Sequence, residues 1–483
     1  MKSLRVLFLF LYPLVGVAAQ HLEVRTEKIT GIEVSPLLVG ANIIYSHEDG
    51  REWNDGEKVR ILKESGIQNL RYPEGHQVSF WDWEFPYHEA YEDIWNPRYE
   101  KKLSPKRKAK LKAKYSNRLG LDQFLSICEE SGVEPIIGIN MFQGYKYDRI
   151  EESIAKAVKL VRYCKSKSPK NRYYFLDNEA GHQPAKNNHI PISAYIKLIP
   201  QYSKAIKEAD PEAQIIANVI SWGKVEALIR DAGAYVDIYE HHWYYSNRKW
   251  GEFYLEDWRA EAFDDEQAKR FLQFNEWKTT YGQPHLKFGL LEWNLGPAKA
   301  VEGATLGNDL YQGLVQADML IQMIRNDVFM ASMWPLTWKS RTKKSEYRNL
   351  INSRTGEVSP SQHIFSSFAK AAKGRVLEVD RTSTLGLSNL TVLSPGRQSV
   401  MIYFINKTPE EKSVDILIDR PVASVQKLIY RGRGHGLTEV DRGNATVGGN
   451  RIHLLLPDTS FAFLEVKLSG DEKVIQLKED SQR

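Results

Sequence analysis

The sequence predicts an α/β fold class, a (β/α)8 barrel followed by a smaller antiparallel β-sandwich domain. Two observations predict it. Apolar strand-like runs alternate with amphipathic helix-like runs over about 350 residues, which suits a barrel of parallel strands. Beyond Gly374 the pattern changes to short β-type runs separated by Gly, Pro, Asn and Asp, as in β-sandwiches. A chain of 483 residues is long enough for one large core and a second, smaller domain.

Residues 1–19 have the layout of a secretory signal peptide. Lys2 and Arg5 precede an apolar run over residues 6–17, and small residues end the segment at Ala19. We expect the mature protein to be secreted, or to reach the periplasm or outer cell surface, with an uncleaved anchor as the alternative. No later apolar run reaches the roughly 18 residues of a membrane helix, so we expect no stable membrane insertion.

The barrel is assigned to residues 20–372, and a leading strand over residues 21–29 is expected to pair into the sandwich. Gly66 ends the first helix, and Pro73, which has no N–H to donate, marks the exit of the second barrel strand. The barrel strands are predicted to end near residue 42 and then to span 69–73, 135–140, 173–179, 214–219, 236–243, 286–292 and 329–336. The helices are predicted at 57–65, 121–131, 150–163, 192–208, 225–231 and 309–326.

The sandwich is assigned to residues 373–470, and residues 471–483 read as a polar, frayed tail. Its strands are predicted at 375–379, 399–405, 413–418, 425–430, 451–455 and 460–466. An open doubly wound sheet is the alternative to the barrel. The Gly-containing strand exits, at Gly181 and Gly296, lack the spacing of a phosphate-binding loop, which favours the barrel.

Cys128 and Cys164 are the only cysteines, and each lies in a helix-like pattern. Small thiols are common in buried helix faces, so we expect two core thiols and no disulfide framework. A bridge between them stays open as the alternative, because it would form only if the two helices touch with suitable geometry.

Two apolar strands end in carboxylates. The run from Tyr173 to Leu176 leads to Asn178 and Glu179, and the run that begins at Leu286 leads to Glu292. The carboxyl ends of barrel strands share one face, so the two carboxylates are expected to meet. Hydrolysis of a glycosidic bond needs an acid and a second carboxylate. We expect the carboxyl groups of Glu179 and Glu292 to lie roughly 5 Å apart, which is typical of retaining glycosidases. Asn178 is expected to bind the 2-hydroxyl of the sugar.

Rings and imidazoles flank these strand ends. Trp293 and Trp334 are expected to contact the sugar, with Trp334 as a floor for its apolar face, although core packing is the alternative for any one ring. A metal site from Glu240, His241 and His242 is disfavoured, because adjacent strand residues point to opposite faces. We therefore expect neither a metal nor a cofactor.

The positions of Asn178-Glu179, Glu292 and Arg71-Tyr72-Pro73 resemble the retaining enzymes of glycoside hydrolase clan A. Residues 121–140, 237–245 and 363–379 are similar to the α-L-arabinofuranosidase and β-xylosidase branch of that clan, which joins such a barrel to a β-sandwich. Agarase- and porphyranase-like enzymes are a further resemblance. The likeness spans about residues 30 to 466.

This resemblance implies roles for individual residues. Glu179 would be the acid/base and Glu292 the nucleophile, with Arg71 and Tyr244 holding the nucleophile and His242 lining the glycone site. One departure stands next to the second strand. Where the arabinofuranosidases have a second Gly after the Pro, this chain has Glu74, Gly75 and His76, followed by a Trp-rich insertion.

The segment from Lys101 to Arg118 holds nine Lys or Arg and no Asp or Glu. It follows the second strand, and a second basic cluster follows the eighth, so both are expected on the catalytic face. A solvent-exposed helix that binds nothing is the alternative interpretation of residues 101–118. The second cluster comprises Lys339, Arg341, Lys343, Lys344 and Arg348.

Two basic clusters on one face favour an anionic or sulfated galactan of the agar, porphyran or carrageenan type as the polysaccharide or oligosaccharide substrate. An α-L-arabinofuranosidase or β-xylosidase acting on plant cell-wall glycans is the alternative, and a non-catalytic carbohydrate-binding protein is a second one. Nucleic acid is an unfavoured partner, since export is expected and no basic helical reader is present in the sequence. The linkage, endo or exo action and oligomeric state are not predicted.

Overall fold

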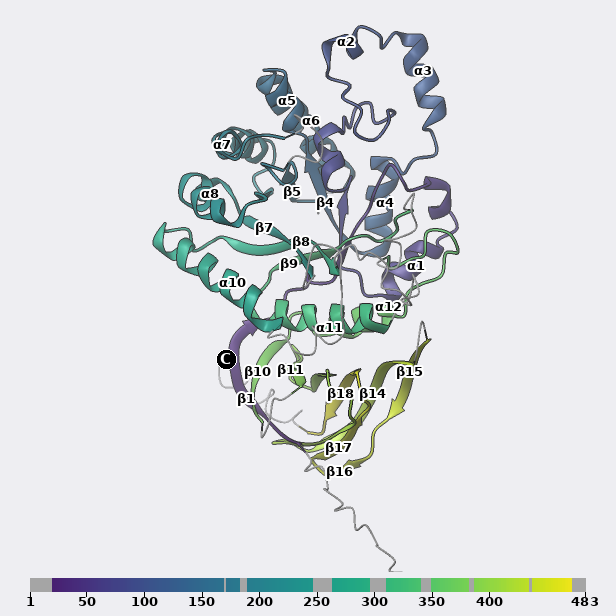
Figure 1. The fold of residues 1–483 in the computed structure, drawn as a ribbon, viewed down its shortest axis with the longest axis vertical. Helices are drawn as coiled ribbons and strands as arrows, with labels where there is room; N and C mark the ends of the chain where they lie inside the picture. Colours follow the sequence, from purple (N-terminus) through teal and green to yellow (C-terminus); the bar gives the residue numbers. More distant parts are fainter. Residues whose placement is uncertain are drawn as a thin grey trace, which may run out of the picture.

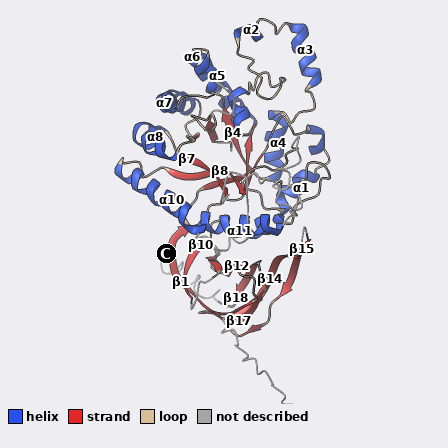
Figure 2. Ribbon diagram, in the orientation of Figure 1, coloured by secondary structure: helices blue, strands red, loops and turns tan. Residues whose placement is uncertain are grey.

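The computed structural model describes residues 20–168, 171–182, 189–245, 263–295, 310–339, 349–381, 386–433 and 437–470 (Figure 1). Within these residues a barrel ringed by helices lies against a separate sheet domain (Figure 2). The expected signal segment, the polar tail and residues 340–348 of the second basic cluster lie outside the described residues.

The barrel is closed, with eight parallel strands in chain order and β2 paired to both β3 and β9. The predicted fold class is therefore confirmed, and every predicted barrel strand is present. The strands are β2 (Gly40–Asn42), β3 (Asn69–Tyr72), β4 (Glu134–Ile139), β5 (Tyr173–Leu176), β6 (Gln214–Ala217), β7 (Ile238–Tyr245), β8 (Lys287–Leu295) and β9 (Met330–Met333).

Helices surround the barrel, and the connection after β3 carries an additional helical arm. The ring comprises α1 (Glu57–Glu64), α4 (Leu121–Ser131), α5 (Phe142–Lys146), α6 (Ile150–Lys167), α7 (Ile192–Ala209), α8 (Val225–Ala232), α10 (Phe263–Thr280), α11 (Leu310–Arg325) and α12 (Ser361–Ala369). The arm holds α2 (Pro97–Glu100) and α3 (Pro105–Lys114), and the described part of the chain also contains the short 3-10 turns η1 (Gly50–Trp53), η2 (His76–Phe80), η3 (Trp222–Lys224) and η4 (Gly233–Tyr235). No helix among the described residues is long and apolar enough to cross a membrane.

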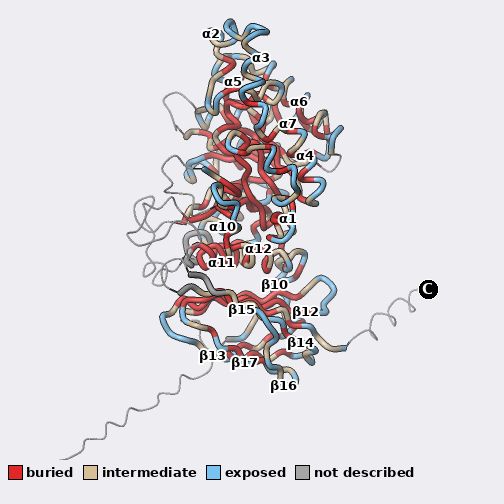
Figure 3. Tube along the Cα trace, turned by 90° about the vertical axis from the view of Figure 1, so that its right-hand side faces the viewer, coloured by how far each residue is buried: buried red, intermediate tan, exposed pale blue. Residues whose placement is uncertain are grey.

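Apolar side chains fill the inside of the barrel beneath its carboxyl-end face, as in other barrels whose interior is a packed core. This inner cluster comprises Leu37, Val78, Ile136, Phe175, Ile216, Ile238, Leu291 and Met330. A larger cluster packs the outside of the strands against the helices and includes the buried, free thiols Cys128 and Cys164. Buried backbone accordingly runs through the middle of the barrel (Figure 3).

The second domain is one ten-stranded, mostly antiparallel sheet that encloses its own apolar core. Its first strand comes from the start of the described chain: β1 (Gln20–Glu33) pairs antiparallel with β10 and parallel with β13. Residues 20–33 thus belong to the sheet, as expected for the leading strand, and the barrel begins after Glu33, not at residue 20. The remaining strands are β10 (Arg375–Arg381), β11 (Leu387–Leu393), β12 (Ser399–Asn406), β13 (Lys412–Ile418), β14 (Val422–Arg433), β15 (Leu437–Asn444), β16 (Val447–Gly448), β17 (Arg451–Leu456) and β18 (Ser460–Leu468).

Helices α11 and α12 lie between the barrel and the sheet (Figure 1). The ring of Phe368 stacks on Tyr403 at 4.5 Å between centroids, and the Tyr403 hydroxyl donates to the carbonyl of Ser367 over 2.8 Å. Gly313 lets α11 approach Tyr430, because a Cβ there would lie 2.6 Å from the Tyr430 hydroxyl. An apolar core shared in this way holds the two domains as one unit.

Candidate active site

Glu179 and Glu292 meet at the carboxyl-end face of the barrel. Glu179 follows β5 and Glu292 lies in β8, and one carboxylate oxygen of each lies within 4.8 Å of the other. Both side chains are about one-tenth exposed. This spacing matches the roughly 5 Å between the two carboxyl groups of retaining glycosidases and is too short to seat a water molecule as in inverting ones.

The backbone that delivers Glu179 is strained. Strand β5 stops at Leu176, earlier than predicted, and Asp177 and Glu179 both have positive φ, 58° and 45°. The buried Asp177 carboxylate accepts backbone N–H bonds from Met141 at 3.0 Å and Phe142 at 2.6 Å. Strained non-glycine residues persist only where surrounding contacts fix them, and Asp177 supplies those contacts.

Strand β8 delivers Glu292 through an irregularity in its pairing with β9, between Leu290 and Trp293. Leu291 lies in the inner barrel cluster and Glu292 contacts Arg71, also inside the barrel, so two consecutive side chains face inward. Trp293 then faces outward. It is fully buried and packs edge-to-face on Phe365 of α12 at 6.0 Å. The prediction that Trp293 binds sugar is therefore wrong, because no part of the ring is accessible.

Arg71 and Tyr244 hold the two oxygens of Glu292. The Arg71 guanidinium is fully buried and donates from Nη1 to Oε1 over 2.8 Å, while the Tyr244 hydroxyl donates to Oε2 over 2.9 Å. The other terminal nitrogen of Arg71, Nη2, donates to the side-chain amide oxygen of Asn178, Oδ1, over 2.6 Å. The arrangement fixes the orientation of both Glu292 oxygens, as attack by a carboxylate nucleophile requires.

His242 lies between the two carboxylates. Its Nδ1 is 2.6 Å from Glu179 and 3.5 Å from Glu292, and its Nε2 is 3.4 Å from the buried Glu240. Burial alone would lower the pKa of His242, but the three carboxylates raise it well above its usual value. A cationic imidazole at this place attracts the carboxylate groups that surround it.

The residues after β3 that differ from the arabinofuranosidase pattern, Glu74 to His76, lie directly at the site. A Cβ at Gly75 would come 2.3 Å from Oε1 of Glu292, so only glycine fits there. Glu74, the preceding residue, has φ 127° and is buried, and its burial raises the pKa of its carboxyl to about 8. A left-handed conformation is costly for a residue with a side chain, and strain of this kind clusters at functional sites.

Two further imidazoles, those of His76 and His182, contact Glu179, and no sequence pattern pointed to His182. Oε2 of Glu179 lies 3.0 Å from Nε2 of His76 and 2.7 Å from Nδ1 of His182. Two ligands of one tetrahedral zinc ion stand about 3.3 Å apart, given bond lengths near 2.0 Å, so the shorter spacings here suit direct contacts between imidazole and carboxylate better than a shared metal. Glu179, His242 and Glu292 form the other compact donor group among the described residues, and in it Nδ1 of His242 forms a hydrogen bond of 2.6 Å with Glu179.

A cavity of about 250 Å³ opens beside Glu179, at the small end of the range for ligand pockets. Its lining comprises Glu179, Asn218, Val219, Ile220, His241, His242, Trp243, Tyr244 and Arg270. Trp334 follows β9 and is half-buried, with its carbonyl accepting from Asn294 over 2.5 Å. Its use as a floor for the sugar stays a prediction.

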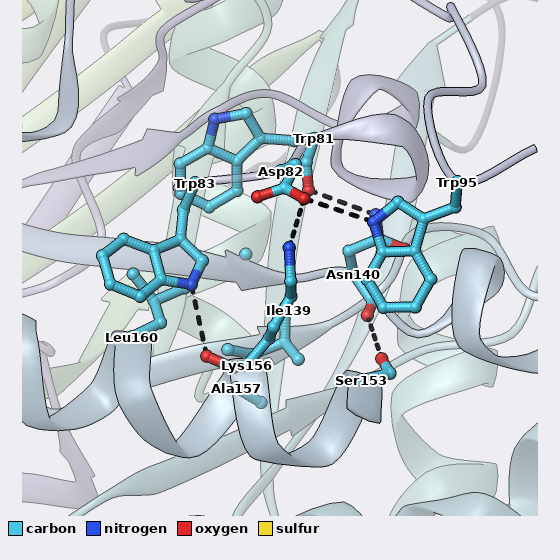
Figure 4. A pocket seen from close by; sticks show the side chains of 11 residues that line it. Trp81, Asp82, Trp83, Trp95, Ile139, Asn140, Ser153, Lys156, Ala157 and Leu160 are labelled. Carbon is cyan, nitrogen blue, oxygen red and sulfur yellow. Dashed lines mark hydrogen bonds and ion pairs between the residues drawn. The ribbon is translucent and has the colours of Figure 1, made fainter. Parts of the chain in front are cut away.

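The Trp-rich insertion is packed against the barrel and not open to a ligand (Figure 4). The indole of Trp95 donates to Asp82 over 3.3 Å, and Asp82 also pairs with Lys156 of α6. The cavity between Trp81, Trp95 and α6 holds only about 20 Å³, room for about one water molecule. These rings anchor the long connection after β3 to the barrel.

Comparisons with known proteins agree with this architecture. The family model described as alpha-L-arabinofuranosidase 1 domain matches residues 61–267. A curated relative, the intracellular exo-alpha-(1->5)-L-arabinofuranosidase of Acetivibrio thermocellus, is 22% identical over 437 residues, which cover 77% of this chain and 80% of the relative.

Solved structures match over nearly the whole chain. The alpha-L-arabinofuranosidase of Thermotoga maritima in complex with arabinose has a TM-score of 0.72 at 16% identity, and the family 51 enzyme of Thermotoga petrophila one of 0.73 at 16%; each match covers 93% of this chain and 100% of the other. A family 44 xyloglucanase of Paenibacillus polymyxa has a TM-score of 0.61 at 13% identity, with the same coverage. At such identities the likeness shows the fold, which enzymes of different specificity share.

A closed barrel with two facing carboxylates, joined to a mostly antiparallel sheet domain, has the architecture of clan A, and the chain is a glycoside hydrolase. More narrowly, residues 61–267 are similar to the alpha-L-arabinofuranosidase 1 domain.

Proposed function

We propose that the chain is a retaining α-L-arabinofuranosidase in which Glu292 is the nucleophile and Glu179 the acid/base. The observation that carries the mechanism is the pair of carboxylates within 4.8 Å of each other, with both oxygens of Glu292 held by Arg71 and Tyr244. The observations that favour an arabinofuranosyl substrate are the matching domain model and the curated relative, which is named for that activity.

The reaction takes two steps. Glu292 attacks the anomeric carbon while Glu179 gives a proton to the leaving oxygen, and a covalent glycosyl-enzyme forms. Water then attacks the same carbon, with Glu179 accepting its proton, and Glu292 leaves. Two displacements on one carbon return the configuration of the substrate. Asn178, held by Arg71, presents its amide to the 2-hydroxyl of the sugar in this proposal.

A panel of small aryl glycosides tests the substrate class. We expect the purified protein to hydrolyse 4-nitrophenyl α-L-arabinofuranoside at least about 100-fold faster, in kcat/KM, than the β-D-xylopyranoside and β-D-galactopyranoside. Glu292→Gln should abolish the activity, while azide should restore turnover to Glu179→Ala, since loss of the acid/base side chain opens space for an external nucleophile. Preference for the xyloside would favour the β-xylosidase alternative, and full activity of Glu292→Gln would overturn the assignment of the nucleophile.

An anionic galactan is the second candidate substrate, and the basic arm is the observation that favours it. None of the residues of α3 is buried, and the helix itself lies at the outer end of the arm, away from the sheet domain (Figure 1). Part of this charge has a local partner, since Lys114 lies 2.8 Å from Glu89 and Lys108 lies over the ring of Phe85. Lys339 of the second basic cluster is exposed, and its other members lie outside the described residues. We rank this substrate behind arabinofuranosides.

Export remains part of the proposal and rests on the layout of residues 1–19 alone. The curated relative is named as intracellular. Expression of the full chain with a C-terminal tag, followed by fractionation and N-terminal sequencing of the product, tests it. A new N-terminus near Gln20 in the exported fraction is the expected result, and an uncleaved chain retained inside the cell would contradict it.

A further inference from the structure

The cavity beside Glu179 has no assigned occupant in the two-step reaction above. It holds about 250 Å³, and among the described residues its lining includes Glu179 but not Glu292. Residues 218–220, which follow β6, form one wall of it. The backbone N–H of Ile220 donates to the carbonyl of Ala180 over 3.1 Å, so this wall runs alongside the residue that follows Glu179.

The place of the cavity relative to the two carboxylates indicates what enters it. In a retaining glycosidase the acid/base gives its proton to the leaving oxygen, while the nucleophile attacks the anomeric carbon from the other side. With Glu179 as the acid/base, the leaving group departs past Glu179. Tyr244 lines the cavity and also holds Glu292, so the cavity adjoins the position of the sugar that is attacked.

Arg270 of α10 also lines the cavity, and its guanidinium is held on two sides. Nη1 lies 3.0 Å from Nε2 of His241, and the guanidinium lies over the ring of Trp222 at 5.5 Å. A guanidinium can only donate, so Nε2 of His241 accepts, and the ring proton is on Nδ1, 3.3 Å from the Tyr239 hydroxyl. Burial and the charge of Arg270 lower the pKa of His241 to about 3, in agreement with a neutral ring. His241 therefore orients Arg270 without neutralising its charge.

Two further side chains of the wall suit a sugar. Nδ2 of Asn218 donates to the buried carboxylate of Glu240, which fixes the amide, and Oδ1 of Asn218 has no hydrogen-bond partner within the described part of the chain. Asn218 is only 4% exposed, and a buried amide oxygen without a donor is costly, which favours a ligand that carries hydroxyl groups. Ile220 is 39% exposed and adds an apolar surface, as ligand pockets commonly have.

We propose, building on the retaining mechanism above, that this cavity binds the first sugar of the leaving group and, in the reverse direction, an acceptor sugar. Arg270 donates to an oxygen of that sugar, Asn218 accepts from one of its hydroxyls, and Ile220 packs on its C–H groups. Arg270 and Asn218 are then specificity-determining residues, and His241 is a positioning residue. The cavity is at the small end of the range for ligand pockets, which suits one sugar ring and not a longer chain.

Transfer to an acceptor sugar reports on this cavity. When a hydroxyl of the acceptor attacks C1, the bond from C1 to Glu292 breaks, a new C–O bond forms, and the hydroxyl proton passes to Glu179. This step is the reverse of leaving-group departure, so the acceptor occupies the place of the leaving group. Methanol reacts by the same step but has no ring for the wall to bind.

The partition of the glycosyl-enzyme is measured with 4-nitrophenyl α-L-arabinofuranoside and either D-xylose or methanol as the acceptor. We expect Arg270→Gln to lower the ratio of xylose transfer to hydrolysis by about tenfold and Ile220→Ala by about threefold. The ratio of methanol transfer to hydrolysis should change by less than about twofold. Neither ratio depends on the folded fraction of a variant. Arg162→Gln, at an exposed position of α6, is the matched control and should change neither ratio.

Conservative variants separate recognition from packing. Arg270→Lys keeps a donor and should retain more xylose transfer than Arg270→Gln. His241→Gln, which offers Arg270 an acceptor, should retain more xylose transfer than His241→Phe, which does not. Unchanged xylose transfer in Arg270→Gln and Ile220→Ala, or equal losses of xylose and methanol transfer, would overturn the proposal.

Failure of the proposed function is seen in the parent and not in the variants. A parent without any methanol transfer would contradict the covalent intermediate, and with it this inference. If the parent prefers aryl β-xylosides, those glycosides serve as donors, and the partition between xylose and methanol decides the role of the cavity in the same way.

Discussion

Nη1 of Arg71 lies 2.8 Å from Oε1 of Glu292, and the guanidinium is fully buried. The same side chain contacts Asn178 and Asn42 and stacks on the ring of Phe175 at 4.2 Å. A single buried cation therefore joins β3 to the strand that carries the proposed nucleophile, Glu292, and to the residue before the proposed acid/base, Glu179.

Arg71→Lys tests this connection. A lysine keeps the charge but cannot reach Glu292 and Asn178 together, so we expect kcat/KM to fall by at least about 100-fold, or roughly 3 kcal/mol. Arg60→Lys, at an exposed pair on α1, is the control and should be silent. A loss below about threefold in Arg71→Lys, measured on the aryl arabinofuranoside, would mean that the charge alone suffices.

Trp293 and Trp334 should respond differently. Trp293→Phe leaves a void beside Phe365, so we expect the free energy of unfolding to fall by about 1 to 3 kcal/mol while KM changes less than about twofold. Trp334→Ala should raise KM if its half-buried ring meets the sugar. Urea unfolding and steady-state kinetics on both variants decide this, and an unchanged KM in Trp334→Ala would remove that ring from the site.

Glu74 makes stability depend on pH. Its carboxyl ionises near 4.5 when unfolded and near 8 when folded, so between these values the unfolded state binds fewer protons and the free energy of unfolding falls as pH rises. In Glu74→Gln this contribution is absent. Relative to the parent, the free energy of unfolding of Glu74→Gln should rise by about 1 kcal/mol for each pH unit between pH 5 and 8. Urea titrations at several pH values measure this difference. Glu410→Gln, at an exposed site, should show no such trend, and parallel curves for Glu74→Gln would refute the raised pKa.

The basic arm gives a prediction for polymers. If α3 binds an anionic chain, replacing Lys108, Lys110 and Lys112 together by Gln should raise KM on a sulfated or uronic polymer and weaken its salt dependence. Turnover of a small aryl glycoside should be nearly unchanged. Replacement of three exposed lysines elsewhere, Lys63, Lys197 and Lys204, is the control. Equal kinetics of both triple variants on the polymer, at low salt, would mean that α3 is only a solvated face.

The fold followed from local patterns because each barrel element carries its own signal. Helix α4 spans Leu121–Ser131 as predicted, between a glycine before it and a glycine after it. The carboxyl ends of barrel strands share one face, and this rule likewise predicted that Glu179 and Glu292 lie on the same face. Strands β11 and β15 were missed. The first is buried throughout and lacks alternation, and the second is largely polar.

The other residues of the site could not be predicted from the sequence, because they come together only through contacts between distant segments. His76 and His182 stand in turns, 106 positions apart, and only the unusual Glu74-Gly75-His76 run hinted at the first. Trp293 was misplaced although strand alternation sets it opposite Glu292. The alternation that puts His241 and His242 on opposite faces of β7 also predicts that Trp293 faces away from the site on β8.

The stereochemistry of transfer tests the central claim, double displacement by Glu292, most directly. Reaction of an aryl α-L-arabinofuranoside in aqueous methanol gives a methyl arabinofuranoside whose anomeric configuration is stable and is read by proton NMR. Carboxylate oxygens within 4.8 Å of each other predict the methyl α-L-arabinofuranoside, formed with retention from a covalent intermediate on Glu292. The β anomer, formed by inversion, would contradict it.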